Sequence, residues 1–194
     1  MSKKGFLLVL MQPPPAFEDE FNAWYDTEHV PERVAVPGFE AGRRYVCIDG
    51  HPKYLAMYDM AHEDVLETEG YKRVSGDRAS PWTKRVTSRV KVYRSIGEQI
   101  YPGDQVTLPA ARATLLRFAG APASVGDAVV AGVRKNFEGR AHTAQVRVFA
   151  YHVDGAVDFL ALVASRAPDE FVLDTEVFGA AAPFLDMVNR YALY

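Results

Sequence analysis

The stretch FLLVLMQPPPAFEDEFNAWYDTEH, residues 6–29, decides how the fold begins. Residues 6–11 are a short, continuous apolar run, which predicts a strand that is buried on both faces. Prolines 13–15 end this run, and proline suits the first turn of a helix. Acidic residues 18–20 then lie where the helix dipole favours negative charge. The helix is predicted to be amphipathic, because its apolar residues recur at helical spacing: Phe17, Phe21, Trp24 and Tyr25.

The rest of the first half alternates between strand and helix patterns. Pro31 disfavours helical geometry at Val30, so the helix should end near residues 28–29 and a loop should follow over 30–40. Two strands, a helix, a loop and a last strand are then predicted at 42–48, 54–60, 63–74, 75–83 and 86–96. This β-α-β-β-α-β order is that of a ferredoxin-like unit.

The same order repeats after a stretch of glycine and proline without clear periodicity, which we take as a linker at 97–112. A strand, a helix, two strands, a helix and a strand are predicted at 113–119, 125–137, 143–153, 158–165, 175–188 and 189–194. A shift of 108 residues lays residues 6–8 over 114–116. Residue identity is low, so the repeat is one of pattern only.

We therefore predict an α+β fold in which two ferredoxin-like units pack sheet to sheet as an intramolecular α+β barrel. The first unit spans residues 1–96 and carries the candidate site, and the second, degenerate unit spans 113–194. A four-stranded sheet with helices on one face leaves its other face bare, and two such sheets packed together bury both.

Composition excludes several classes of protein. The chain has 194 residues with 48% hydrophobic and 24% charged residues, which is typical of a globular protein. A net charge of −3 does not favour a nucleic-acid surface. The single cysteine, Cys47, excludes an internal disulfide framework, and the histidines other than His29 show no metal-ligand spacing. Because no apolar run reaches the roughly 20 residues of a membrane span, we expect a cytoplasmic protein.

His29 is the leading candidate for catalysis, with Glu28 beside it. Imidazole titrates near neutral pH and can move protons there; the alternative is a surface histidine at a helix end. Glu28 lies four residues after Trp24 on the apolar stripe, and a buried carboxylate needs a partner. His29, Arg43 or Arg44 would serve, unless the helix has already ended and Glu28 faces water.

Aromatic and basic residues supply the candidate substrate-binding groups. Trp24 and Tyr25 belong either to the core or to the wall of a ligand cavity. On the strand at 42–48, alternation places Arg43 and Tyr45 on one face and Arg44 on the other. Arginines on covered strands predict a positive cavity that favours a carboxylate or phenolate, and salt bridges at strand ends are the alternative.

Two further aromatic residues complete the predicted substrate site. Tyr58 shares a strand face with Tyr54, and Trp82 lies in a nearby predicted loop. Together they would form an aromatic wall with hydroxyl donors, although core packing explains them equally well.

The segment FNAWYDTEHVPER at 21–33 resembles the EthD-like branch of the dimeric α+β barrel superfamily. The resemblance extends to VPGF at 36–39, RRY at 43–45, PKYLAMY at 52–58 and SPWT at 80–83, and so covers roughly residues 5–100. In that superfamily a ferredoxin-like unit pairs with another to close a barrel, and the helix-end histidine commonly faces a cleft. Members include polyketide cyclases, cofactor-free monooxygenases, lactone isomerases and haem enzymes. The resemblance therefore supports the fold better than any one reaction.

We expect a cofactor-independent enzyme that uses histidine acid/base chemistry on an aromatic or polyketide-like anionic substrate. Lyase, isomerase, cyclase and decarboxylase reactions all fit. The alternatives are a cofactor-free monooxygenase, a haem-binding protein and a non-catalytic small-ligand binding protein. One site per chain is expected, since no Glu-His pair occurs in the helix at 125–137. Open sheet edges would permit a homodimer, although the internal repeat removes the need for one.

Overall fold

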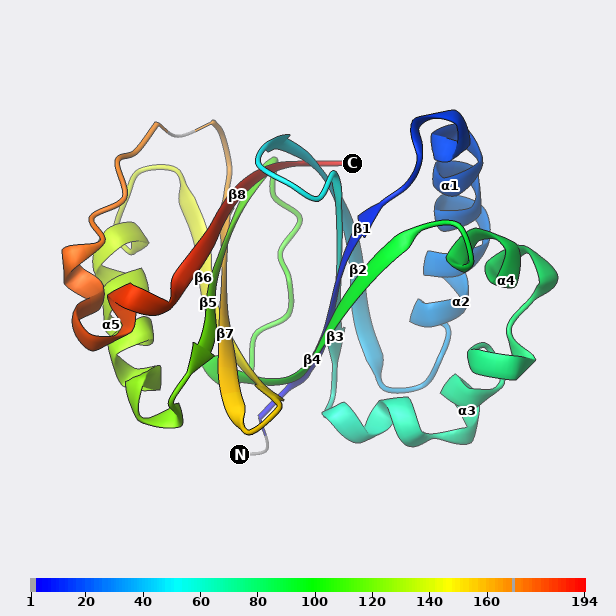
Figure 1. Cartoon of the computed structure of the whole chain (residues 1–194), viewed down its shortest axis with the longest axis horizontal. Coiled ribbons are helices and arrows are strands. Elements are labelled where there is room, and N and C mark those ends of the chain that lie inside the picture. Colours follow the sequence, from blue (N-terminus) through cyan, green and yellow to red (C-terminus); the bar gives the residue numbers. More distant parts are fainter. Residues whose placement is uncertain (1–2, 169) are drawn as a thin grey trace.

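The computed structural model describes residues 3–168 and 170–194, and its strands close into a barrel with helices packed outside (Figure 1). Around the barrel the order is β1-β3-β2-β8-β5-β7-β6-β4, with every neighbouring pair antiparallel. The strands are β1 (Gly5–Gln12), β2 (Phe39–Asp49), β3 (Tyr54–Met60), β4 (Lys91–Tyr101), β5 (Arg112–Ala121), β6 (Thr143–Val153), β7 (Ala156–Ser165) and β8 (Leu185–Leu193).

The barrel consists of two four-stranded halves that repeat one topology. Strands β1 to β4 follow the order β4-β1-β3-β2, and strands β5 to β8 follow β8-β5-β7-β6. The halves are joined by β2 with β8 and by β4 with β6, along short stretches from Tyr45 to Asp49 and from Glu98 to Tyr101. The predicted α+β barrel of two ferredoxin-like halves is confirmed.

Strand alternation separates three hydrophobic clusters. Leu8 and Leu10 of β1 point into the barrel, whereas Leu7 and Val9 point out towards the first set of helices. Leu115 of the second half also points into the barrel. The predicted shift of 108 residues is therefore wrong, because it superposes the outward-facing Leu7 on the inward-facing Leu115.

The first helical segment is longer than predicted. It consists of α1 (Glu18–Trp24), a π-helical turn (Tyr25–His29) and α2 (Val30–Val34). Pro31 lies in the first turn of α2, where a proline is tolerated, and so it does not end the helix at residue 29. The loop predicted at 30–40 therefore begins with a helix, and β2 already starts at Phe39.

Three other predicted boundaries are corrected. The helix predicted at 63–74 is a 3₁₀ turn (Glu63–Glu67) followed by α3 (Glu69–Lys72). Helix α4 (Pro81–Thr87) occupies the end of the predicted loop at 75–83 and the start of the predicted strand at 86–96. The sequence does contain a start signal for α4, because Ser80 caps the helix with its side chain and Pro81 follows in the first turn.

In the second half, α5 (Gly126–Phe137) lies close to its predicted place. The predicted helix at 175–188 is instead a 3₁₀ segment (Glu176–Phe184) that is interrupted at Gly179, where φ is 51°. Pro183 lies inside this segment, and β8 has begun by Leu185. Among the described residues, no helix is long and apolar enough to cross a membrane.

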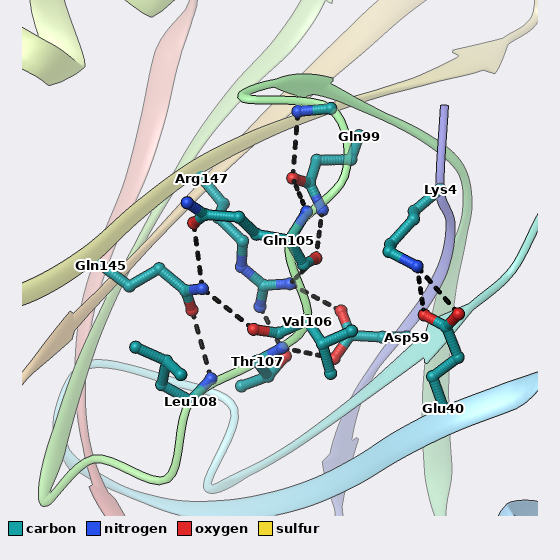
Figure 2. A network of polar contacts seen from close by, with 11 residues as sticks. Lys4, Glu40, Asp59, Gln99, Gln105, Val106, Thr107, Leu108, Gln145 and Arg147 are labelled. Atoms are coloured by element: carbon teal, nitrogen blue, oxygen red, sulfur yellow. Dashed lines mark hydrogen bonds and ion pairs between the residues drawn. The ribbon is translucent and has the colours of Figure 1, made fainter. Parts of the chain in front are cut away.

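The segment that joins the two halves contributes to the barrel. Residues 97–101 belong to β4, and the rest of the predicted linker runs through the middle of Figure 1 between the two halves. Thr107 is buried, and its N–H donates to Asp59 at 2.8 Å. Asp59 also pairs with Arg147 at 2.6 Å, so β3, the linker and β6 are held in one polar network (Figure 2).

Candidate functional site

A cavity of about 200 Å³ lies between the first set of helices and the outward face of β1, β3 and β4. Leu7 and Val9 of β1 form its floor. Its walls are largely aromatic, and its polar groups include one imidazole and two guanidinium groups, besides Lys84 and the side chains of Ser75, Thr83 and Thr87. The residues that carry these features are Phe21, Trp24, Tyr25, Tyr58 and Tyr71, together with His29, Arg33 and Arg94.

His29 ends the π-helical turn, and its imidazole lies against two aromatic rings. The ring centroid is 4.3 Å from that of Trp24 and 4.9 Å from that of Tyr25. The Nδ1 atom is buried and has no hydrogen-bond partner among the described residues. Burial lowers the pKa of His29 well below its usual value, and Arg33, Arg94 and Arg44 lower it further. The structure therefore holds a neutral imidazole in this cavity.

Two tyrosines place phenol groups next to the imidazole. Tyr25 and Tyr58 are both fully buried, and both line the cavity. Burial raises the pKa of Tyr25 to about 12 and raises that of Tyr58 still more. Both phenols therefore stay protonated near neutral pH. The Tyr58 hydroxyl is buried and has no hydrogen-bond partner among the described residues, so its O–H is available to an oxygen atom of a ligand.

Two arginines line the cavity. Arg33 of α2 is 5% exposed, and its guanidinium carbon lies 5.3 Å from the centre of the Tyr71 ring. Arg94 of β4 is more exposed and donates from Nη2 to the Tyr71 hydroxyl at 2.9 Å. The cavity therefore combines apolar walls with positive charge, an arrangement suited to a small anion with an apolar body.

Glu28 lies behind the cavity rather than in it. Its carboxylate accepts hydrogen bonds from the Ser80 hydroxyl and from Thr83 Oγ1, the latter at 3.1 Å. Thr83 Oγ1 in turn accepts from Trp24 Nε1 at 3.0 Å. Glu28 thus fastens the start of α4 to the first helical segment and fixes the indole that contacts His29. The partners predicted for Glu28, which were His29, Arg43 and Arg44, are not those that the structure shows.

The two arginines that were predicted to bind the substrate, Arg43 and Arg44, lie outside the cavity. Arg44 faces the helices, where it pairs with Asp26 and donates to Asn22 Oδ1 at 2.6 Å. Arg43 and Tyr45 face the barrel interior, since they pair in register with the inward-facing Met57 and Leu55. The predicted alternation on β2 is thus observed, but these three residues do not line the cavity.

Trp82 also lies outside the cavity lining. Its Nε1 donates to Glu20 Oε1 at 3.2 Å. Its ring is partly buried against the hydrophobic cluster that lies between the helices of the first half and the outward face of β1 and β3. Of the predicted site residues, the cavity brings together Trp24, Tyr25, Tyr58 and His29.

The residues that sequence reasoning missed are Arg33, Tyr71 and Arg94. The signal for Arg33 was its position four residues after His29, which places both side chains on one face of a continuous helix. That signal was lost when the helix was ended at Pro31. Tyr71 and Arg94 come from α3 and β4 and reach the cavity only through tertiary packing.

The second half fills the space between its helix and its sheet. The Phe178 ring packs at 5.0 Å from that of Phe118. A Cβ atom on Gly132 of α5 would lie 2.3 Å from Phe178 Cδ1, so a glycine is required for this close approach. The interior of this half is therefore packed by side chains where the first half has its cavity.

The side chains and the size of the cavity bear on whether the candidate site could hold a metal ion or haem. The described residues bring together no group of three or more His, Cys, Asp and Glu side chains in a metal-binding arrangement. The cavity of about 200 Å³ is smaller than the roughly 300–1,000 Å³ of pockets for drug-sized ligands. A haem macrocycle is too large for this space, so the residues here do not fit haem.

No protein-family model and no curated protein matches the sequence. Solved structures do match over the whole chain. An anthrone oxidase-like protein has a TM-score of 0.69 and 11% identity, covering 100% of this chain and 92% of its own. A Fusobacterium nucleatum protein proposed to be a monooxygenase has a TM-score of 0.63 and 8% identity, covering 99% and 92%.

A mutant chlorite dismutase from Candidatus Nitrospira defluvii, in complex with cyanide, has a TM-score of 0.56 and 8% identity and covers 100% of this chain and 91% of its own. Identities this low establish the fold and not the reaction. Together with the closed barrel of two ferredoxin-like halves, these matches show that the chain has the fold of the dimeric α+β barrel superfamily, formed here within one polypeptide.

Proposed function

We propose that the chain is a cofactor-independent enzyme in which His29 moves a proton on a small anionic substrate, aromatic or polyketide-like, bound in the cavity. One observation carries the proposal: a half-buried imidazole, held neutral, lines an aromatic cavity with a buried Nδ1 atom that has no hydrogen-bond partner among the described residues. A neutral imidazole accepts a proton, and a buried polar atom without a partner is costly unless a ligand uses it.

The other cavity groups suit chemistry next to a carbonyl group. When a base removes a proton beside a carbonyl, negative charge develops on the carbonyl oxygen. The Tyr58 hydroxyl, which is buried without a hydrogen-bond partner among the described residues, would donate to that oxygen, and the arginines would stabilise its charge. Isomerase, lyase, cyclase and decarboxylase reactions all share such a step.

Glu28 acts in this proposal as a positioning residue. Its contacts with Ser80 and Thr83 hold Trp24, and the Trp24 indole packs on the imidazole. Assignment to the EthD-like branch belongs to the same proposal, because it rests on the motif at 21–33 that carries both Trp24 and His29.

The test begins with a thermal-shift screen of small aromatic and β-keto acids, because a ligand of the native state raises the melting temperature. Stabilising compounds are then assayed for turnover with the wild type, His29→Gln and the surface control His142→Gln. We expect turnover in the wild type and the control and its loss in His29→Gln. Equal turnover in all three proteins would remove His29 from the mechanism.

A second function uses the same base and is favoured by two neighbours, the anthrone oxidase-like protein and the one proposed to be a monooxygenase. After His29 removes a proton, the substrate carbanion would itself reduce O₂. One oxygen atom would end in a new carbonyl group of the product and the other in water. Oxygen uptake that matches product formation identifies this reaction, and turnover without oxygen uptake excludes it.

A further inference from the structure

We infer that Arg33 and Tyr71 form an oxyanion subsite in the cavity, which selects small ring compounds that carry a carboxylate over their neutral analogues. This inference rests on the proposed function for the place of the substrate, and it names the group that the substrate must present. Anion recognition, which the sequence analysis assigned to Arg43 and Arg44, is thereby assigned to Arg33 of α2.

Arg33 is a buried charge with an incomplete set of partners. It is 5% exposed, and its Nη1 atom makes no hydrogen bond to the described residues. Its ion pair is with Glu32, whose Oε2 lies 3.8 Å away, and that oxygen also makes no hydrogen bond. A buried guanidinium without a hydrogen-bonded counter-ion is destabilising, so its retention here is explained by a ligand that completes the pair.

Glu32 lies near Arg33, but the two side chains are not hydrogen-bonded to each other. Burial raises the pKa of Glu32, and the nearby carboxylate of Glu28 raises it further, against the opposing effect of Arg33. The Glu32 side chain is also 31% exposed and so lies partly in water. A carboxylate that entered the cavity would meet the free Nη1 donor of Arg33 directly.

The other buried arginines show the contrast. Arg44 is bonded to Asp26 and Asn22. Arg147 is bonded to Asp59 and Thr107. Among the buried arginines of the described chain, Arg33 therefore lacks a hydrogen-bonded counter-ion, and it is also the one that lines the cavity.

Tyr71 supplies the second donor of the subsite. Its hydroxyl oxygen accepts from Arg94 at 2.9 Å, which leaves its own proton to donate to a ligand. Its ring lies under the Arg33 guanidinium and stacks on Phe39 with an interplanar angle of 13°. These contacts hold Arg33 and the Tyr71 hydroxyl on the same side of the cavity. One guanidinium and one phenol donor match the two oxygens of a single carboxylate.

The experiment compares benzoate with benzamide by calorimetric titration at pH 7.5. The two probes have nearly the same shape, and only benzoate carries a charge. We expect the wild type to bind benzoate more tightly and Arg33→Met to lose about 10- to 100-fold in benzoate affinity, as for a hydrogen bond to a charged group. Benzamide affinity should change little.

Arg78→Met is the matched control, because Arg78 is an exposed arginine near the cavity that does not line it. It should keep the preference for benzoate. Tyr71→Phe, a smaller change, should lose part of the preference and keeps the inference testable if Arg33→Met does not fold. The inference is overturned if the wild type binds neither probe, binds both equally, or keeps its preference without Arg33 or without the Tyr71 hydroxyl.

The same titration separates this inference from the proposed function. His29→Gln should still prefer benzoate, because His29 is not part of the oxyanion subsite. If His29→Gln also keeps full turnover, the proposed base is wrong while the subsite stands. If Arg33→Met keeps the benzoate preference while His29→Gln loses turnover, the subsite is wrong and the base stands.

Discussion

Replacing His29 with glutamine is expected to remove an acid-sensitive part of the stability of the protein. Burial and three arginines lower the pKa of His29 in the folded state, whereas an unfolded histidine titrates at about 6.5. Well above pH 6.5 both states are neutral at this residue, and its titration does not affect stability. As the pH falls below 6.5, the unfolded chain takes up a proton that the folded chain refuses, and unfolding is favoured.

The size of the change in the free energy of unfolding follows from the uptake of one proton by the unfolded chain. The free energy of unfolding should fall by about 1.4 kcal/mol per pH unit, from pH 6.5 down to the pKa of the folded state. Relative to pH 8, the loss through His29 at pH 5.5, one unit below the unfolded pKa, amounts to about 1.4 kcal/mol. It is measured by urea denaturation of the wild type, His29→Gln and the exposed control His142→Gln at several pH values.

The comparison uses the change with pH and not the absolute stability. A packing defect caused by glutamine between Trp24 and Tyr25 is the same at each pH and cancels. The wild type and His142→Gln should decline more steeply below pH 6.5 than His29→Gln. Parallel curves for all three proteins would mean that the folded protein protonates His29 as readily as the unfolded chain. The neutral imidazole, and with it the proposed base, would then be refuted.

Three further substitutions test the framework around the site, each by chemical denaturation. Gly132→Ala should destabilise the fold by about 1–3 kcal/mol through overpacking against Phe178, and an unchanged midpoint would contradict this. Arg147→Met should lose about 3–5 kcal/mol by leaving the buried Asp59 carboxylate without its counter-ion, and adding Asp59→Leu should recover most of the loss. Glu28→Ala should lose about 1–3 kcal/mol and speed amide exchange in α4, whereas unaltered exchange would remove its positioning role.

Element order was readable from the sequence because it depends on local periodicity. The alternation of β2 correctly separated Arg44 from Arg43 and Tyr45. Element ends were less readable. Pro31 was taken to end a helix that continues through it, because a local rule cannot anticipate a π-helical turn.

The residues of the candidate site likewise fall into those that the sequence identified and those that only the structure shows. His29, Trp24 and Tyr25 were found because they belong to one short motif on one helical segment. Their cavity partners Tyr71 and Arg94 lie on α3 and β4, and no local spacing connects them to the motif. Glu28 was noticed as a buried carboxylate that needs a partner, but Ser80 and Thr83 are 52 and 55 residues away along the chain.

The sequence by itself determined the repeated β-α-β-β-α-β order and the motif that carries His29, since periodicity and motifs involve near neighbours in the chain. Only the tertiary structure decided which arginine is left without a full partner. That outcome depends on which acid or amide each guanidinium meets after folding: Arg44 meets Asp26, Arg147 meets Asp59, and Arg33 meets the cavity. Burial and charge pairing are properties of the packed chain, so the proposed place of anion recognition follows only from the tertiary structure.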